Sequence, residues 1–358
     1  GGGAAAAAAN TRDELIGGGR ADVVRRDSVR ELLQRAADVE AAADEMKLPE
    51  YSTKELLART KRTLVSKDNP EHYYSVDEKH VLGKGGFGAV YGGKRLDTGE
   101  RVAIKKMTIN AKNRPSFLLV ETELHAKSSH NEHVVKYIDS FHVADRNEFW
   151  IVTEYIEGGT LQDFIPLRAF KETHIAYITS CVVDALMHIH KAHRIHRDIK
   201  LSNVLVGTDG SVKLTDFGLA AQLTLHQRQR ATVLGTADFM APEIIRGAKY
   251  GIKVDIWSLG MLVFEMTKGE TPYHGLAPRK VLEALDAGGP PKLTHKKWSV
   301  AMKDFTAQCL QMDPEKRPTS RALTLHPWWR RAASQEQLKA LVKIVKSKGD
   351  ADGGCVVQ

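Results

Sequence analysis

Hydrophobic and polar positions change their spacing at about Tyr74 and again at the pair Gly158–Gly159. From about Tyr74 up to that pair, short apolar stretches such as GAVYGGKRL, RVAIKKM and FWIVTEYI alternate with turn residues, which is typical of a small antiparallel β-sheet. Beyond the pair, the apolar residues Ile175, Ile178 and Val182 keep the spacing of one helix face. The pattern therefore predicts an α+β protein with two lobes: a small sheet lobe that includes one helix, then a large, mainly helical lobe.

Segments of different character flank the two lobes. Residues 1–19 are low in complexity and begin without Met, so we expect them to be disordered or derived from a tag. Two capping boxes, SVRE at residues 28–31 and STKE at residues 52–55, predict a helical extension over residues 20–73. The expected boundaries of the remaining parts are 74–157 for the small lobe, 158–330 for the large lobe and 331–358 for a basic, amphipathic tail.

Composition limits the class of protein more than it identifies it. The 358 residues are 42% hydrophobic and 27% charged, and no apolar stretch approaches the roughly 18 residues that a membrane helix needs. Three separated cysteines, Cys181, Cys309 and Cys355, argue against a disulfide framework and favour a reducing compartment such as the cytoplasm. The net charge of +8 suits phosphates, nucleic acid or an anionic membrane, so charge alone does not choose a partner.

The first stretch with recognisable chemistry is rich in glycine. Gly83, Gly85 and Gly88 form a G-x-G-x-x-G pattern, with Val90 two residues further on. Glycines let backbone amides approach phosphate oxygens closely, and dinucleotide-binding folds use the same spacing before a helix. Here the sequence AVYGG continues as a strand, which favours a hairpin that covers the phosphates of a nucleotide.

A lysine in an apolar strand follows the glycine pattern. Lys105 ends the stretch VAIK, where burial of its ammonium group requires an acidic partner. Glu121 follows FLLV in a stretch compatible with a helix, so its side chain is expected to reach back to Lys105, and Glu123 is the alternative partner. An ordinary surface lysine is the other interpretation, and the residues downstream argue against it.

Histidines and basic residues concentrate in HIHKAHRIHRDIKLSN, residues 188–203, which contains a single acid, Asp198. A zinc site would need a closed set of ligands, and the nearest cysteine, Cys181, has no suitable spacing. A nucleic-acid site is disfavoured because Asp198 interrupts the basic run and no aromatic residues alternate with it for base stacking. A catalytic loop is the favoured interpretation.

Five stretches, GKGGFGAV, VAIK, HRDIKLSN, DFG and APE, occur in this order, and together they resemble the motifs of the protein kinases over roughly residues 75–330. GSVKLTDFG, YGIKVDIWSLG and MDPEKRPT are similar to the sterile-twenty group, in particular to the PAK kinases. The resemblance implies a bilobal protein kinase fold and ATP-dependent phosphate transfer to protein substrates. The sequence DIK in the loop implies serine or threonine as the acceptor.

The resemblance also implies a role for each motif residue. Asp198 would orient the attacking hydroxyl and accept its proton, and Lys200 would neutralise the transferred phosphate. Lys105, held by Glu121, would hold the phosphates of ATP. The residues expected to bind ATP are Leu82, Gly83, Gly85, Gly88, Val90, Ala103, Lys105, Thr153 as gatekeeper, Glu154, Ile156 and Leu205, and those expected to bind magnesium are Asn203 and Asp216.

The segment between DFG and APE carries the expected switch. Thr232 resembles the activating phosphosite, and its phosphate, added by an upstream kinase or by the protein itself, would pair with Arg197. Thr236 is expected to contact the catalytic loop. Three departures from the resembled pattern leave the peptide preference open: GTADFMAPE lacks the PYW expected after GT, Ser202 replaces a frequent acid, and His125 stands at a usually apolar helix position. The missing acid at Ser202 would weaken recognition of an arginine upstream of the acceptor.

Structural partners and binding partners follow from the same resemblance. Asp255 and Arg317 resemble structural residues, with Arg317 pairing with Glu243. The implied binding partners are protein substrates with Ser or Thr, with no specific nucleic acid, for a chain that is a monomer or a transient dimer. A pseudokinase scaffold at a membrane is the alternative, although such proteins usually lack a phosphate- or metal-binding residue that is present here.

The tail suggests attachment to an anionic membrane surface. SQEQLKALVKIVKSK places Leu338, Leu341, Val342 and Val345 on one helix face among lysines. The final CVVQ is a C-a-a-X pattern that makes Cys355 a candidate for a farnesyl group. One lipid binds only marginally, at about 0.8 kcal/mol per buried methylene, so the lysines, at about 1 kcal/mol each, would have to help. A helix packed on the large lobe before a disordered end is an equal alternative.

Overall fold

The computed structural model describes most of the chain from residue 64 onward. The residues described are 64–85, 88–110, 115–167, 169–222 and 236–351. They all belong to one compact unit, residues 47–358. The two capping boxes, Thr232 and Cys355 lie outside the described residues, and what the sequence predicts for them stays a prediction.

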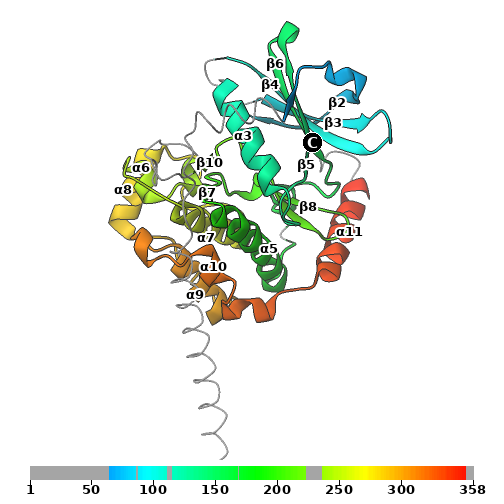
Figure 1. The fold of residues 1–358 in the computed structure, drawn as a ribbon. Coiled ribbons are helices and arrows are strands. Elements are labelled where there is room, and N and C mark those ends of the chain that lie inside the picture. The colour runs from blue at the N-terminus through cyan, green and yellow to red at the C-terminus, as the bar shows by residue number, and fades with distance from the viewer. Residues whose placement is uncertain (1–63, 86–87, 111–114, 168, 223–235, 352–358) are drawn as a thin grey trace, which may run out of the picture. The chain divides into compact units, whose positions relative to one another are not determined.

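The small lobe is built on a six-stranded sheet in the order β1-β5-β6-β4-β3-β2, with helix α3 (Pro115–Ser128) beside it (Figure 1). The strands are β1 (Val65–Ser66), β2 (Tyr74–Gly85), β3 (Gly88–Arg95), β4 (Arg101–Thr108), β5 (Tyr137–Val143) and β6 (Glu148–Glu154). Neighbouring strands from β5 to β2 are antiparallel, as the alternating pattern predicts. Strand β1 instead runs parallel to β5 and pairs Val65 with Ser140.

Side chains alternate between the two faces of this sheet. Phe149 and Ile151 of β6 join a cluster with Leu118 of α3, whereas Trp150 and Val152 join a second cluster. Each of these side chains is at most 3% exposed. Burial of a large apolar side chain contributes about 1.5–3 kcal/mol, and a slip by one residue would move the whole set to the wrong face. The alternation therefore fixes the register of the strands that carry the site.

Residues 64–73 differ from the helical extension that the sequence predicts up to residue 73. They contain strand β1 and the 3-10 helix η1 (Pro70–His72). Val65 pairs with β5 and packs against the cluster around Leu118, so tertiary contacts decide its conformation. A local hydrophobic pattern does not contain this information.

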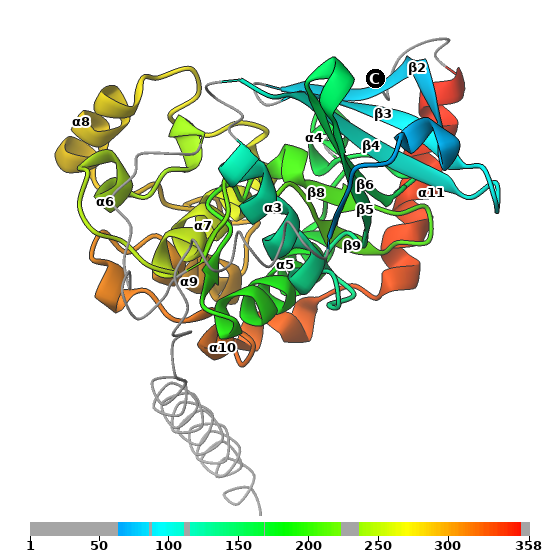
Figure 2. The same ribbon diagram turned by 45° about the horizontal axis from the view of Figure 1, so that its top comes forward.

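Helices α5 (Glu172–Lys191) and α7 (Lys253–Lys268) run through the large lobe and supply much of its core (Figures 1 and 2). Ile175, Ile178 and Val182 of α5 are buried, which is the face that the sequence spacing predicts. The remaining α-helices are α4 (Leu161–Phe164), α6 (Pro242–Ile245), α8 (Pro278–Gly288), α9 (Val300–Cys309), α10 (Ser320–Leu323) and α11 (Gln335–Ala351).

Short strands and single 3-10 turns complete the two lobes. Strand β7 (Arg194–Ile195) pairs with β10 (Ala221–Gln222), and β8 (Val204–Val206) pairs with β9 (Val212–Leu214). The 3-10 helices are η2 (Ala144–Arg146), η3 (Leu201–Asn203), η4 (Ala237–Phe239), η5 (Pro314–Lys316) and η6 (Pro327–Arg331). The hairpin of β8 and β9 connects the loop that contains Asp198, which ends at η3, to the DFG segment, which follows β9.

The tail helix α11 packs on the large lobe. Leu338, Val342 and Val345 are at most 8% exposed and belong to the main core cluster. Lys339 and Lys343 occupy exposed positions of the same helix. The packed helix was one of two interpretations of the tail, and it is the one that the apolar face adopts. Among the described residues, none of the helices has the length and apolar character that crossing a bilayer requires.

Candidate active site

Lys105 on β4 lies between two carboxylates. Its Nζ is 2.7 Å from Glu121 Oε1 on α3 and 2.9 Å from Asp216 Oδ1 in the segment after β9. The alternative partner suggested by the sequence, Glu123, forms an ion pair with Lys127 on its own helix instead. The structure thus brings a strand, a helix and the DFG segment together through one ammonium group.

These charges set the protonation states of the three groups. Burial disfavours the charged form of Asp216, yet the Lys105 ammonium holds the pKa of that carboxyl well below its usual range. Burial also opposes the charge on Lys105, but the charges of Asp216 and Glu121 raise its pKa above the usual range. Burial raises the pKa of Glu121, and the nearby Asp216 charge adds to this effect. Lys105 and Asp216 are therefore both charged near neutral pH.

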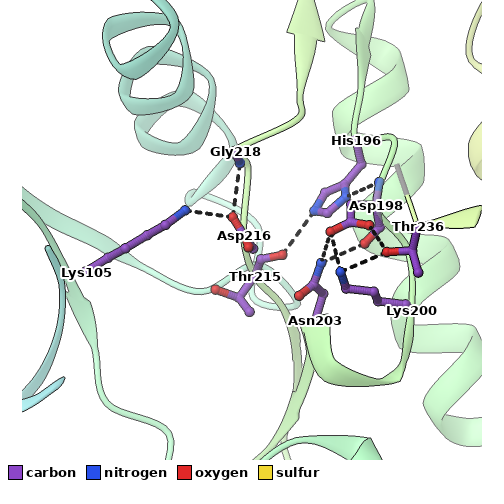
Figure 3. Close-up of polar contacts among 9 residues, drawn as sticks. All are labelled: Lys105, His196, Asp198, Lys200, Asn203, Thr215, Asp216, Gly218 and Thr236. Carbon is purple, nitrogen blue, oxygen red and sulfur yellow. Dashed lines mark hydrogen bonds and ion pairs between the residues drawn. The ribbon is translucent and has the colours of Figure 1, made fainter. Parts of the chain in front are cut away.

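The backbone after β9 aims Asp216 at the lysine (Figure 3). Asp216 has a φ of 65°, a left-handed conformation that costs a non-glycine residue about 1–2 kcal/mol. The backbone N–H of Gly218 donates to Asp216 Oδ1 over 3.1 Å. A Cβ on Gly218 would lie 3.1 Å from that oxygen and 3.4 Å from Lys105 Nζ, so glycine lets the turn close against the ion pair.

A second group of polar contacts surrounds the buried Asp198 (Figure 3). Asn203 donates from Nδ2 to the backbone carbonyl and to Oδ2 of Asp198, at 2.8 Å each. Lys200 Nζ lies 2.8 Å from the same Oδ2, and Thr236 donates to Oδ1 over 3.0 Å. Both carboxylate oxygens are thus held by donors from the loop and from Thr236. A side chain held in this way suits a group that orients a hydroxyl and takes its proton.

Asp255 on α7 fixes the backbone of the same loop. Its buried carboxylate accepts from the backbone N–H groups of His196 and Arg197, at 2.9 and 2.7 Å, and from Nε2 of His190 at 2.8 Å. His190 also contacts Ser320 Oγ over 2.9 Å. These histidines satisfy buried polar groups. Within the part of the chain that the structure describes, no group of three or more His, Cys, Asp or Glu side chains is arranged to hold a metal ion.

The glycine-rich pattern lies at the end of β2 and the start of β3. Gly85 pairs with Gly88, and Gly83 pairs with Val90 further from the turn. Gly88 has a φ of 149°, and a Cβ there would lie 2.2 Å from a backbone oxygen of β4, so this position requires glycine. Leu82 lies next to Gly83 on β2.

The remaining residues predicted to bind ATP are Ala103 on β4, Thr153 and Glu154 on β6, Ile156 in the linker that follows, and Leu205 on β8. Each is partly exposed, whereas Val102 and Ile104, the neighbours of Ala103 on β4, are fully buried. Ala103 pairs with Thr153 across the sheet. The Glu154 carboxylate accepts from Lys213 Nζ over 2.8 Å. Because the side chain is engaged in this ion pair, the backbone of Glu154 is the part available to an adenine base.

Arg197 contacts the start of the segment between DFG and APE, called the activation segment below. Its guanidinium donates to the carbonyl oxygens of Leu219 and Ala220 and to the hydroxyl of Tyr250. The predicted phosphosite Thr232 lies outside the described residues, so its expected pairing with Arg197 stays a prediction. A phosphate that reached Arg197 would have to share or replace these hydrogen bonds.

An acidic pair that the sequence reasoning missed lies near Thr236. Oε2 of Glu265 on α7 is buried and has no hydrogen-bond partner among the residues that the structure describes. Burial, together with the charge of Asp238, raises the pKa of Glu265 to about 7. Asp238 follows Thr236 by two residues and accepts from Thr271 Oγ1 over 3.0 Å. The one sequence signal is a charged residue within the apolar run LGMLVFEM.

Other candidate residues have structural roles. Arg317 forms two hydrogen bonds to the Glu243 carboxylate, at 2.6 and 2.8 Å, in the interior of the large lobe. Cys181 and Cys309 are both buried. Burial raises the pKa of Cys181 to about 12 and also raises the pKa of Cys309, so neither thiol is a nucleophile near neutral pH.

The fold and this site together define a protein kinase: a small sheet lobe and a helical lobe that meet at a lysine–aspartate ion pair beside a loop with a buried aspartate. The sequence matches the protein kinase domain over residues 76–329, and the chain belongs to the protein kinase family.

Curated relatives with known names support a narrower grouping. The serine/threonine-protein kinase pakC of Dictyostelium discoideum is 42% identical over 290 residues, which are 79% of this chain and 59% of the relative. The serine/threonine-protein kinase PAK 1 of Mus musculus is 39% identical over 301 residues, 84% of this chain and 54% of the relative. The chain thus spans little more than half the length of these relatives, which are serine/threonine kinases of the PAK type.

The residues present fit the nucleotide and divalent cation that protein kinases use. The amide nitrogen of Asn203 donates to Asp198, so the amide oxygen is the atom available to a cation. Asp216 adds a carboxylate that stays ionised near neutral pH. Oxygen atoms of carboxylates and amides are the ligands that hard divalent cations prefer. Lys105 contributes the positive charge that phosphates require.

Proposed function

We propose that this chain is an active ATP- and Mg²⁺-dependent kinase that phosphorylates serine or threonine residues of other proteins. The observation that carries the proposal is the set of polar contacts in Figure 3, in which Lys105 binds Asp216 while Asp198 is held by Asn203 and Lys200. The names of the relatives support the choice of serine and threonine as acceptors.

Each of these residues has a distinct task in phosphate transfer, which depends mainly on positioning and charge neutralisation. Asp198, aimed by Asn203, orients the substrate hydroxyl and accepts its proton during attack. Lys200 and Lys105 neutralise the negative charge of the phosphates. When bound, Mg²⁺ neutralises further phosphate charge, and Asn203 and Asp216 supply its protein ligands.

A pseudokinase scaffold is the alternative function, and one assay separates the two. The full chain is incubated with ATP, Mg²⁺ and a generic basic protein, and phosphoserine and phosphothreonine are measured in the product. Transfer supports the kinase. ATP binding without any transfer, even after treatment with an upstream kinase, would favour the scaffold.

We also propose that the preferred substrates carry an arginine or lysine close to the acceptor residue. Glu265 presents a buried carboxylate oxygen, and Asp238 adds a second negative charge. Asp238 is near the acceptor position because Thr236, two residues earlier, contacts Asp198. A buried carboxylate is costly unless it is paired, and a guanidinium or ammonium group from a substrate would supply the pair.

Phosphorylation of Thr232 is proposed as the switch. A phosphate near Arg197 would tie residue 232 to the beginning of the same segment, which Arg197 already holds at Ala220. We expect Thr232→Ala to lower kcat/KM about tenfold, the effect of losing one charge-assisted hydrogen bond, with ATP affinity unchanged. Thr224→Ala, in the same segment, serves as the control. An active wild type without phosphate on residue 232, as seen by mass spectrometry, contradicts the switch.

We further propose that a farnesyl group on Cys355 brings the kinase to membranes. Helix α11 packs its apolar face on the large lobe, so the lipid would be the inserting group and the exposed lysines would add electrostatic attraction. The wild type, expressed in cells with active prenyltransferases, should partition into a detergent phase, and Cys355→Ser should remain aqueous. Cys181→Ser is the control. A wild type that stays in the aqueous phase would exclude the lipid.

A further inference from the structure

The segment just before the family domain is tied to strand β5 through side chains. The carbonyl oxygen of Leu64 lies 2.9 Å from Ser140 Oγ and 3.1 Å from Tyr137 Oη, and these two hydroxyls are 2.9 Å apart. Ser140 is only 2% exposed. Burial raises the pKa of Tyr137 to about 12, so its hydroxyl keeps the proton that it donates. The family match begins at residue 76, so Leu64 lies before it.

The same segment also packs against the helix that carries Glu121. Val65 of β1 and Tyr137 of β5 both contact the buried cluster that includes Leu118 of α3 and Ile151 of β6. Leu118 precedes Glu121 by three residues, which is close to one helical turn, so the two side chains lie on neighbouring parts of the helix surface. Val65 therefore helps to fill the space between α3 and the sheet.

A row of rings leads from Tyr137 to the active site. The Tyr137 ring meets the His125 ring edge to face, with centroids 6.0 Å apart, and His125 stacks on Phe217 of the DFG segment at 4.9 Å. Phe217 in turn meets the edge of His196 in the catalytic loop at 5.0 Å. Such ring pairs are attractive beyond the area that they bury. Displacing α3 would break the stack at His125.

His125 also makes a hydrogen bond that an apolar residue at this helix position cannot make. Its Nε2 lies 2.8 Å from the carbonyl oxygen of the buried Val135, and burial lowers the pKa of His125 to about 4, so the neutral ring donates through Nε2. The backbone N–H of Val135 donates to the carbonyl oxygen of Leu214 over 2.9 Å. Leu214 stands two residues before Asp216, so His125 connects α3 to the DFG segment along two routes.

We propose that Leu64–Ser66 is a positioning segment for the active site, which acts through Tyr137 and His125 to hold α3 where Glu121 meets Lys105. The inference rests on the proposed kinase function for its effect on catalysis. Tyr137, Ser140 and His125 are positioning residues in this scheme, because none of them touches the reacting groups. The segment Leu64–Ser66 thereby contributes to the rate of phosphate transfer.

The experiment removes the two hydroxyls that bind Leu64 while keeping both side chains in place. The double variant Tyr137→Phe with Ser140→Ala, made in the full chain, should lower kcat about three- to tenfold, the size expected for one or two lost hydrogen bonds. KM for ATP should change by less than about twofold, because the residues predicted to bind the adenine of ATP are unaltered. Hydrogen exchange of the α3 amides should become faster in the same variant.

Tyr74→Phe is the matched control, because it removes the hydroxyl of another small-lobe tyrosine, which binds Asp139. It should leave kcat and exchange in α3 unchanged, even if both variants lose thermal stability. Unchanged kcat and unchanged exchange of α3 in the double variant would reduce the segment to a purely structural role. If the wild type were inactive but hydrogen exchange of α3 were still faster in the double variant, the proposed kinase function would be contradicted. The coupling between Leu64–Ser66 and α3 would still be supported.

Discussion

The Asp198→Asn variant is expected to transfer phosphate about a thousandfold more slowly than the wild type, within the range that a general base contributes. Asparagine keeps the shape of the side chain and still accepts from Thr236, but it cannot take a proton from the substrate hydroxyl. It also places an amide where Lys200 and Asn203 now donate to a carboxylate oxygen. Measurement of kcat at saturating ATP, Mg²⁺ and substrate tests this expectation.

Two comparisons give the Asp198 result its meaning. ATP affinity should be unchanged in the variant, because Lys105 and Asp216, the residues proposed to hold the phosphates and the metal, are unaltered. Asp209→Asn removes a carboxylate from the exposed turn between β8 and β9 and should have full activity. If Asp198→Asn kept the activity of the wild type, the assignment of the base would fail even though the fold is that of a kinase.

The features that depend on local periodicity could be predicted from the sequence. The buried face of α5 follows the helical spacing of Ile175 and Ile178, and the antiparallel pairs follow the alternation of residues such as Phe149 and Trp150. The two-lobed fold is confirmed by the family match. Periodicity works here because burial of each apolar side chain stabilises one register over its neighbours.

The pairing of Lys105 with Glu121 needed a different kind of reasoning. A lysine in an apolar strand requires an acid, and the helical spacing of Glu121 after FLLV makes it a better partner than Glu123. Chemical necessity narrows the choice to a few residues. It does not place Asp216, which the DFG motif singles out and which reaches the lysine through a left-handed backbone.

The features that escaped prediction join residues that are far apart in the sequence. Strand β1 forms because Val65 fills a space beside α3, and the use of His125 appears only when Val135 and Phe217 are placed around it. An isolated histidine at an apolar position looked like a departure from the family. In the structure it makes a buried hydrogen bond and a ring stack. Long-range geometry, rather than residue type, carries this information.

The acidic pair near Thr236 leads to the second large effect. We expect Glu265→Gln to lower kcat/KM about ten- to a hundredfold for a peptide with an arginine near its acceptor serine, as for loss of a buried, charge-assisted hydrogen bond. Glutamine keeps the shape of the side chain but removes the charge that would bind the guanidinium. A peptide with alanine in place of that arginine should react equally well with both enzymes. Steady-state kinetics with the two peptides measure the difference.

The pH dependence gives an independent check on the same carboxyl group. Because burial and Asp238 raise the pKa of Glu265 to about 7, the free enzyme loses this negative charge as the pH falls through that value. The preference for the arginine peptide should therefore weaken at lower pH in the wild type and be nearly constant in Glu265→Gln. Glu270→Gln, on the exposed loop after α7, should behave as the wild type. Equal use of both peptides by the wild type at every pH would mean that the carboxylate pairs with something other than the substrate.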